Sequence, residues 1–438
     1  MRLSKTYSTD DKFVLNLFLW AFIARAALLV IISFVLVYYD RILTYPKYPG
    51  WAPNLIGDAS YYTLRGYWMA LDWSGYPLSQ KILKSAYNPI YGWNGYTYLL
   101  AFFHKIFGFS PISSTLLNCL FGSLIGTFSY LIAREYLSIK VARLTAVMVS
   151  FFPSLFLWSI TNLKDTFMIL CIVFILWAFI RFNSVSGRGK LVFLSFIVAG
   201  LLALATLRKG VGFLMPIVLA SSYLISLKKP SVFLKLLAVA GVILYLLLPG
   251  KDMLQKFDYM VHKSVYRLLA MHQATVPIKG SSYKILDEKY YLHNPEFHPY
   301  TSPDEEYYAY PTIKLGYLQY ARIYLRAMTH FLFEPYIWKL DSKLKLLSLT
   351  QMFFWYPLLS FALLGLFILM RYLSGQYLIL FIYFLTMSFM IAMSQGNVGT
   401  LFRFRDLLTP VILLWSSVGI AKVLGWKILN SKNNLRFR

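Results

Sequence analysis

The stretch AALLVIISFVLVYY, residues 26–39, contains no charged residue. With the residues before it, it forms a segment from about 13 to 39 that is long enough to cross a hydrocarbon core of roughly 30 Å. Similar runs recur along the chain, as in SFIVAGLLALATL at 195–207. Because these runs are continuous and do not alternate with polar residues, they favour helices over the strands of a membrane barrel. The sequence therefore predicts an all-α polytopic membrane protein.

The composition agrees with that prediction. Hydrophobic residues make up 58% of the 438 residues and charged residues only 14%, a balance that is foreign to water-soluble surfaces. The formal net charge of +25 comes from Lys and Arg that cluster in short segments between apolar runs. We interpret it as a topology signal and as attraction to membrane lipids, with no nucleic acid involved. Cys119 and Cys171 lie inside apolar spans, and we expect them to pack without a disulfide.

The positive-inside rule orients the spans. With Arg2, Lys5 and Lys12 in the cytoplasm, the chain makes about ten crossings and both termini are cytoplasmic. The predicted spans are roughly 13–39, 112–133, 144–160, 166–180, 191–207, 211–227, 232–249, 351–370, 377–393 and 407–425. Residues 92–108 are a short apolar piece, which we predict to lie as a helix on the outer surface. A crossing there would place every later basic loop outside the cytoplasm.

These spans divide the chain into three regions. Residues 1–249 form an N-terminal transmembrane module with a first outer loop at about 40–111, residues 250–348 an extracytoplasmic region, and residues 349–438 the C-terminal transmembrane helices. We expect short helices in the middle region, because it is too long for a turn and too poor in aliphatic residues for a large separate domain. The polar groups between spans gather mostly outside, so we predict an outward working face on a protein of the bacterial inner membrane.

Asp58 is the first candidate for chemistry. In the stretch NLIGDASYYTLRGYWMA it follows the first span, with Tyr62 and Arg65 about one and two helical turns further on. A carboxylate at the outer rim can serve as a general base towards an acceptor hydroxyl, with Tyr62 and Arg65 on the acceptor side of a cavity. The alternative is that Asp58 only caps the start of a helix.

A second acid follows in TNLKDTF, where Lys164 and Asp165 stand at the junction of the third and fourth spans. We predict that Asp165 positions the acceptor or a cation near Asp58, with Lys164 lining the cavity. The alternative is an ion pair that satisfies itself and marks the start of a helix.

Basic residues on the predicted outer side are contrary to the positive-inside rule, so their presence requires an explanation. Arg208 and Lys209 end the fifth span, and Arg403 and Arg405 lie in GNVGTLFRFRD. The guanidinium group of an arginine can bind two phosphate oxygens at once, and the ammonium group of a lysine binds phosphate as a point charge. We therefore predict that these four residues bind a donor phosphate. The glycines of GNVGT would let the main chain approach a ligand closely. Contacts to acidic lipid headgroups are the alternative.

The sequence assigns no metal site. Five histidines fall in or beside the middle region without a recognised metal motif: His262, His272, His293, His298 and His330. No cofactor is required, and a divalent cation is left open.

The order of these motifs resembles the GT-C superfamily of membrane glycosyltransferases, including the protein O-mannosyltransferase and lipid A aminoarabinose transferase types. The resemblance rests on GDASYY after the first span, on NPIYGWNGYTYLLAFFHKIFGFS, and on the run from LLNCLFG to TNLKDTF. It covers roughly residues 10–225. Beyond them, FLFEPYIWKL and GNVGTLFRFRD are similar to uncharacterised proteins of surface-polysaccharide clusters.

The resemblance implies a reaction and two residue roles. A sugar would leave a polyprenyl-phosphate donor, with inversion, for an extracytoplasmic glycan, lipid or protein acceptor. Asp58 would hold the position of the catalytic base and Asp165 that of the second acid. Many relatives have an Asp-Glu pair where this chain has Asp58 and Ala59, so the resemblance leaves metal dependence and acceptor type open.

Two other functions compete with this one. A surface-polysaccharide polymerase or ligase with a lipid-pyrophosphate donor would also use outer arginines. A transporter or flippase would carry ionisable groups at mid-membrane depth, but the span centres here are almost free of charge, with Arg25 as the main exception. We therefore expect a glycosyltransferase.

Overall fold

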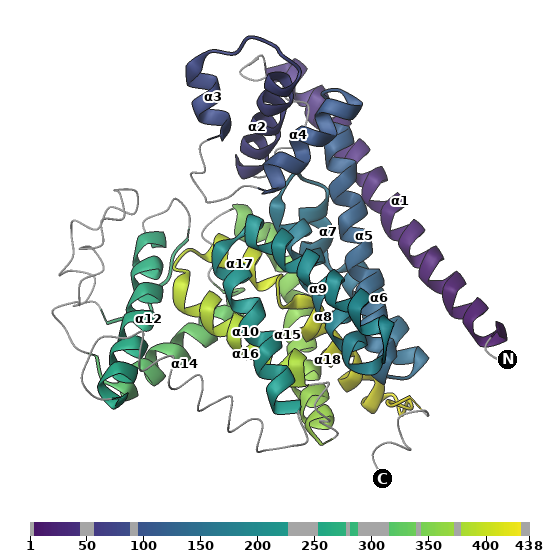
Figure 1. The fold of residues 1–438 in the computed structure, drawn as a ribbon, viewed down its shortest axis with the longest axis vertical. Coiled ribbons are helices and arrows are strands. Elements are labelled where there is room, and N and C mark those ends of the chain that lie inside the picture. Colours follow the sequence, from purple (N-terminus) through teal and green to yellow (C-terminus); the bar gives the residue numbers. More distant parts are fainter. Residues whose placement is uncertain are drawn as a thin grey trace. The chain divides into compact units, whose positions relative to one another are not determined.

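The computed structural model describes residues 4–43, 57–87, 95–226, 253–276, 281–287, 315–338, 343–371 and 378–430. Within these ranges the chain forms sixteen helices and no strand, apart from two isolated β-bridges. The predicted all-α class is confirmed (Figure 1).

The helices of the described residues fall into two compact units. The first unit comprises residues 1–217, 357–372 and 409–438, and the second residues 218–356 and 373–408. The first unit contains α1 (Ser4–Leu43), α2 (Gly57–Trp73), α3 (Gln80–Tyr87), α4 (Gly95–Phe107), α5 (Pro111–Tyr136), α6 (Ile139–Phe151), α7 (Pro153–Ser159), α8 (Lys164–Ser184), α9 (Arg188–Leu207) and α18 (Thr409–Val423). The second contains α12 (Met253–Thr275), α14 (Tyr317–Phe333), α16 (Leu378–Ser394) and α17 (Val398–Arg405). Two helices, α10 (Lys209–Ser226) and α15 (Lys343–Met370), contribute to both units. The three-part division expected from the sequence stays a prediction.

In the described part of the chain, five helices are long and apolar enough to cross a membrane: Asp10–Val35, Ile112–Tyr136, Lys164–Ser184, Arg188–Leu207 and Thr350–Met370. Two bent pairs, α6 with α7 and α17 with α18, pass the same test jointly, which gives up to seven. The helices α10 and α16 are apolar but shorter. Each predicted span on described residues therefore coincides with an apolar helix or a bent pair. The predicted span 232–249 lies outside the described residues.

In the predicted first outer loop, the described residues form the short helices α2, α3 and α4. The helix α4 has 13 residues, fewer than the roughly 20 that cross a bilayer, and it buries one face against α2. Figure 1 shows α2, α3 and α4 gathered beyond one end of α5, away from the start of α1. Residues 95–107 of the predicted surface helix at 92–108 are thus helical, and this helix is too short to span the membrane by itself.

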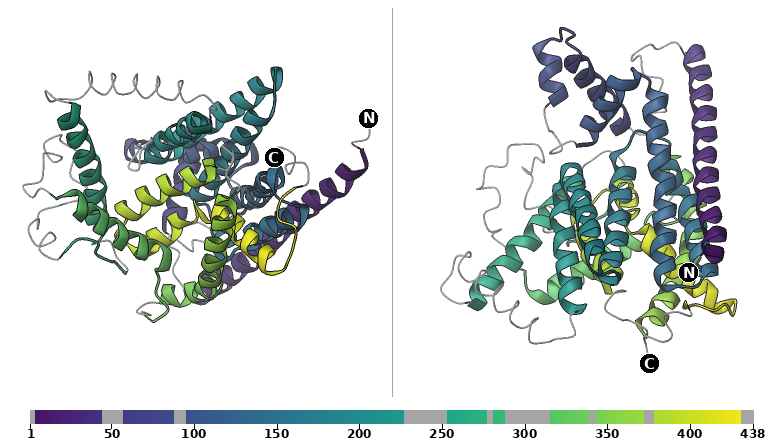
Figure 2. Two further views of the ribbon diagram at one scale, coloured as in Figure 1. Left: turned by 90° about the horizontal axis from the view of Figure 1, so that it is seen from below. Right: turned by 45° about the vertical axis from the view of Figure 1, so that its right-hand side comes forward.

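The opposite end of the first unit joins segments that are distant in the sequence. Asp10 of α1 pairs with Arg134 at 3.3 Å and with Arg143 at 3.2 Å. Leu137, between α5 and α6, forms a β-bridge with Leu429. The start of α1, the basic α5–α6 loop and the end of the described chain therefore share one end of this unit (Figure 2). Shared ends agree with both termini lying on one side of a membrane, and the cytoplasmic side stays a prediction.

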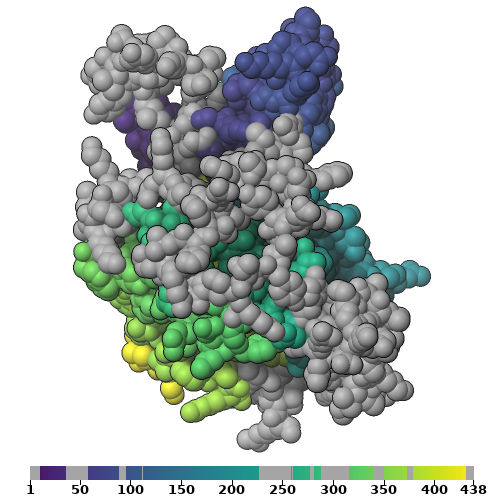
Figure 3. Space-filling view, turned by 90° about the vertical axis from the view of Figure 1, so that its left-hand side faces the viewer, coloured from purple at the N-terminus to yellow at the C-terminus, as the bar shows by residue number. Residues whose placement is uncertain are grey.

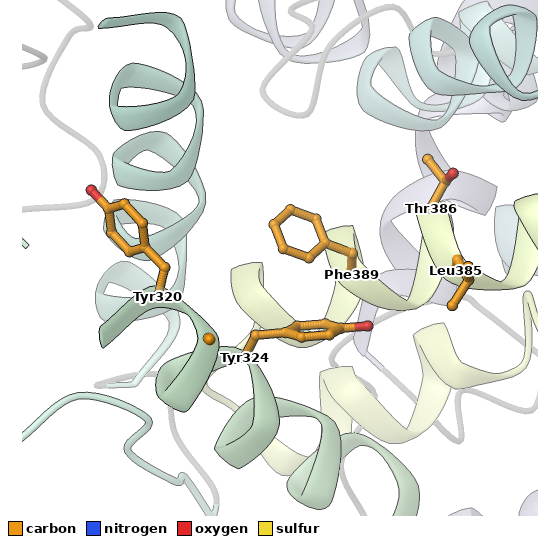
Figure 4. A pocket seen from close by; sticks show the side chains of 6 residues that line it. Tyr320, Tyr324, Leu385, Thr386 and Phe389 are labelled. Atoms are coloured by element: carbon orange, nitrogen blue, oxygen red, sulfur yellow. The ribbon is translucent and has the colours of Figure 1, made fainter. Parts of the chain in front are cut away.

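The second unit contains the helices of the predicted extracytoplasmic region. Its α12, in teal-green, and α14, in green, lie on the face shown in Figure 3. Between α14 and α16 there is an open groove of about 520 Å³, where Tyr324 and Phe389 face each other with ring centroids 5.2 Å apart (Figure 4). The remaining lining residues are Tyr320, Ala321, Leu385 and Thr386.

Candidate functional site

Asp58 lies in the first turn of α2 and is half-buried. Residues 58, 62 and 65 are separated by four and three positions, so they share one face of the helix. Carboxylates are favoured in a first helical turn, where main-chain N–H groups are free to donate. The position of Asp58 is therefore compatible with both predicted roles, the helix cap and the general base.

Tyr62 and Arg65 continue this face into the interior. Both side chains are buried, and the Arg65 guanidinium stacks over the Tyr61 ring at 3.7 Å. The Tyr62 ring meets the ring of Tyr96 on α4 edge-on, at 5.6 Å between centroids. The Arg65 guanidinium thus stacks on an aromatic ring, and Tyr62 is one of the residues through which α2 contacts α4.

Lys164 and Asp165 begin α8, directly after the break that follows α7. Both are buried, and the Lys164 ammonium lies 5.7 Å from the centre of the Tyr62 ring. Since Asp58 lies one turn before Tyr62 on the same helix face, the structure brings the two predicted acidic segments into one region of the first unit. More than a hundred positions separate these segments in the sequence.

Two asparagines hold the segment that carries this acid. Asn118 of α5 donates from Nδ2 to the carbonyl oxygens of Leu163, at 2.9 Å, and Thr161. Asn162 donates from Nδ2 to the Thr63 hydroxyl at 2.9 Å and to the Ser114 hydroxyl at 2.8 Å. Neither asparagine was among the predicted site residues, although an amide inside a predicted span, as at Asn118, can indicate a functional position.

Tyr96 completes the cluster from α4. Its side chain is fully buried, and burial raises its pKa well above the ordinary tyrosine value, with further contributions from Tyr62 and the Asp165 carboxylate. The phenol therefore stays neutral and keeps its O–H proton beside Asp165. We call Asp58, Tyr62, Arg65, Tyr96, Asn118, Asn162, Lys164 and Asp165 the polar cluster.

The polar cluster combines a half-buried carboxylate with a fully buried interior. Asp58 can receive a proton from a hydroxyl that approaches from outside, as a general base does. The buried Asp165, with Lys164 and Tyr96 nearby, lies where a low dielectric strengthens each charge interaction. Within the described ranges, no group of three or more His, Cys, Asp or Glu side chains could hold a metal ion.

Arg208 and Lys209 lie at the corner between α9 and α10, with Arg208 half-buried and Lys209 exposed. The end of α9 lies close to α4, because a Cβ atom at Gly95 would fall 2.0 Å from the Thr206 hydroxyl. These two basic residues are thus at the same end of the first unit as α4.

Arg405 and Arg403 belong to the second unit and differ sharply. The Arg405 guanidinium is buried, donating from Nη1 to the Glu334 carbonyl at 2.8 Å and to the Phe331 carbonyl at 3.3 Å, and it packs over Trp355 at 4.5 Å. It satisfies carbonyls at the end of α14. Arg403 is half-exposed. Arg405 is accounted for by these contacts, so the predicted phosphate role rests mainly on Arg403.

The GNVGT segment before these arginines is held by the rest of the second unit. A Cβ atom at Gly396 would fall 2.6 Å from the His272 carbonyl oxygen, and Gly396 N donates to the Thr275 hydroxyl at 2.6 Å. Gly396 thus permits close packing on α12. The Tyr283 ring lies between His272 and His330, at 5.3 and 4.4 Å. His293 and His298 lie outside the described residues.

One comparison with known proteins gives a match. Residues 95–249, about a third of the chain, match the family described as dolichyl-phosphate-mannose-protein mannosyltransferase. The matched part includes Tyr96, Asn118, Asn162, Lys164 and Asp165, and it begins after Asp58. The match supports a membrane glycosyltransferase of GT-C type and does not distinguish a subtype. A search of curated proteins found no match.

Proposed function

We propose that this protein transfers a sugar from a polyprenyl-phosphate donor to an acceptor outside the cytoplasm. The observation that carries the proposal is the meeting of the two acidic segments at Tyr62, where α2, α4 and α8 converge. The family match supports it, because the matched residues supply Asp165 and most of the polar cluster.

Asp58 is the proposed base. It is the carboxylate of the cluster that is half-exposed, so an acceptor hydroxyl can reach it. Asp165 is proposed to orient the acceptor, and the segment before it is held by the Asn118 and Asn162 hydrogen bonds. Lys164, Tyr62 and Arg65 are proposed to line the same region. The reaction would occur at the membrane's outer rim, where the donor's sugar phosphate lies while its lipid tail stays in the bilayer.

The donor phosphate needs cations near that rim. Arg208 and Lys209 lie at the same end of the first unit as α4. In the second unit, Arg403 is half-exposed. A guanidinium can hold two phosphate oxygens at once. We propose Arg208 and Lys209 as donor contacts in the first unit. Arg403, with Arg405 in support, is a second phosphate contact proposed from the sequence, in the second unit. We place the protein in a bacterial inner membrane.

The test uses purified protein in nanodiscs and a panel of radiolabelled donors. The panel contains undecaprenyl-phosphate and dolichyl-phosphate carrying single hexoses, and undecaprenyl-pyrophosphate oligosaccharides for the alternative polymerase or ligase. Membrane extracts supply acceptors, and release of lipid phosphate is measured. We expect turnover with a monophosphate donor and a loss of about 100-fold or more in Asp58→Asn, because general-base catalysis contributes that much.

Asp72→Asn is the matched control. Asp72 is a carboxylate on the same helix whose Oδ2 accepts a 2.6 Å hydrogen bond from Tyr87, and its loss should leave turnover within about twofold. Full activity in a folded Asp58→Asn protein would remove Asp58 as the base. Turnover with the pyrophosphate donors alone would replace the proposed function by the alternative one.

A further inference from the structure

Arg25 is a charged residue in the middle of the apolar helix α1. It lies inside the candidate span Asp10–Val35 and is completely buried. A guanidinium at such a place is costly unless its donors are satisfied, and such residues are often functional. Its partners therefore indicate what it does.

The partners of Arg25 are the ends of α6 and α7. Its Nη2 donates to the Ser150 carbonyl at 2.7 Å, and its Nε donates to the Ser159 hydroxyl at 2.7 Å. Nη1 donates to the Ala21 carbonyl in its own helix at 3.0 Å, and the guanidinium lies 4.6 Å from the centre of the Phe156 ring. One side chain thus bonds the last turn of α6 and the last residue of α7.

The acceptors exist because the helix is broken. The α6 helix ends at Phe151, and the chain bends by 52° into α7, which starts at Pro153. The last carbonyls of a helix have no partner within it, and Pro153 provides no N–H. The Ser150 carbonyl is one of these last carbonyls. Arg25 therefore stabilises the bend from outside the bent pair.

The bend leads directly to the second acid. Ser159 is the last residue of α7, and Lys164 and Asp165 follow a few residues later. On α5, a Cβ atom at Gly122 would fall 2.5 Å from Ser159 Cβ and 2.8 Å from Arg25 Nε. One turn earlier on α5, Asn118 bonds the Leu163 carbonyl. A continuous set of contacts thus runs from Arg25 to the start of α8.

We infer that Arg25 is a positioning residue, which fixes the α6–α7 bend and thereby the location of Lys164 and Asp165. The inference rests on the proposed function for its catalytic consequence and on the bend alone for its structural one. Misplacing a reacting group by about 1 Å can cost about 100-fold in rate. Loss of the Arg25 contacts should therefore lower kcat and leave donor affinity largely intact.

The structural arm is hydrogen exchange measured by mass spectrometry in nanodiscs. Arg25→Lys and Ser159→Ala should speed exchange at 158–166 by about fivefold or more, because local opening there loses its restraint. The control is Arg181→Met, which breaks the 2.9 Å pair with Glu135. It should speed exchange around 134–143 and leave 158–166 unchanged. Gly122→Ala provides a third perturbation at the same contact if Arg25→Lys does not fold.

The activity arm uses whichever donor turns over in the nanodisc assay. We expect kcat to fall about 10- to 100-fold in Arg25→Met and less in Arg25→Lys, with KM within about threefold, and no such change in Arg181→Met. Absence of turnover in wild type would remove the proposed function, and the exchange arm would still decide the role of Arg25. The inference would be overturned if exchange at 158–166 were unchanged in the folded Arg25→Lys, Ser159→Ala and Gly122→Ala variants. It would also be overturned if Arg181→Met changed exchange at 158–166 and kcat as much as the Arg25 variants do.

Discussion

Arg25 in the first unit and Arg405 in the second unit make the same kinds of contact. Each guanidinium is buried, donates to main-chain carbonyls near a helix end and stacks on an aromatic ring. Arginine suits this role because its fork of donors reaches several acceptors and it is more weakly hydrated than lysine. Arg403, two positions before Arg405 on α17, points elsewhere, because residues two apart diverge by about 200° on a helix.

We expect replacement of these two neighbouring arginines to have different effects. Arg405→Ala should lower the free energy of unfolding by about 3 kcal/mol, since it leaves buried carbonyls at the end of α14 without their donor. Arg403→Ala should keep the stability and weaken donor affinity, and Arg403→Lys should restore part of the loss, because a point charge cannot form the paired contact. Thermal unfolding and donor binding in nanodiscs measure the two effects.

Arg405→Lys serves as the control for charge at the buried position and should recover little stability. If both alanine variants unfold and bind donor as the wild type does, the arginines have neither role, and contact with lipid headgroups is the remaining explanation for Arg403.

At the scale of elements, α4 explains why a short apolar piece need not cross the membrane. Its residues Tyr96, Leu100, Ala101 and His104 are buried, while Phe102 is exposed on another face. The buried face packs on α2 and delivers Tyr96 to the polar cluster. His104 is thus a buried histidine on a helix whose other buried residues pack as in an ordinary core.

Burial makes His104 a source of acid sensitivity. It lowers the His104 pKa from 6.5 to about 4, against a weaker opposing hydrogen bond with Gly108. The unfolded chain therefore binds more protons between pH 6.5 and 4, so stability is complete above this window and is lost as the pH falls through it. The loss is at most about 3 kcal/mol for this residue.

Removing the imidazole should flatten that pH dependence. His104→Leu should shrink the fall in the thermal midpoint between pH 7 and about 4.5. The rest of the fall should persist, because burial also lowers the pKa of His272 to about 4. Scans of both single variants and the double variant in one detergent measure the effect. A fall as large in His104→Leu as in the wild type would show that His104 does not titrate on unfolding.

The first unit has two chemically different ends. One end joins Asp10, Arg134, Arg143 and the Leu137–Leu429 bridge, and the other carries α2, α3 and α4 with the polar cluster. The basic end agrees with the positive-inside rule if it faces the cytoplasm. The polar cluster would then face outward, as the sequence predicts.

Cysteine labelling in intact cells tests this orientation. Ser79, between α2 and α3, and Ser186, between α8 and α9, are both exposed, whereas Cys119 and Cys171 are buried and give low background. A membrane-impermeant maleimide should label Ser79→Cys in whole cells and Ser186→Cys only after lysis. The reverse pattern would invert the predicted topology and move the polar cluster to the cytoplasmic side.

The sequence by itself determined the class of this protein and the extent of most of its helices. Continuous apolar runs such as 26–39 must satisfy their main-chain groups internally when no water is present, so a helix is the available structure. Asp58 and Asp165 were singled out from the sequence, because a carboxylate beside an apolar run is conspicuous, and their roles stay predictions. The family match is consistent with the GT-C resemblance drawn from the same motifs.

Only the tertiary structure decided which polar residues meet. The pairing of Asn118 with Leu163, of Tyr96 with Tyr62 and of Arg25 with the α6–α7 bend depends on how helices pack. Local sequence carries no such information, because packing contacts join segments distant in the chain and depend on shape at each crossing. For the same reason Arg405 looked like a surface cation in the sequence and is a buried partner of α14 in the fold.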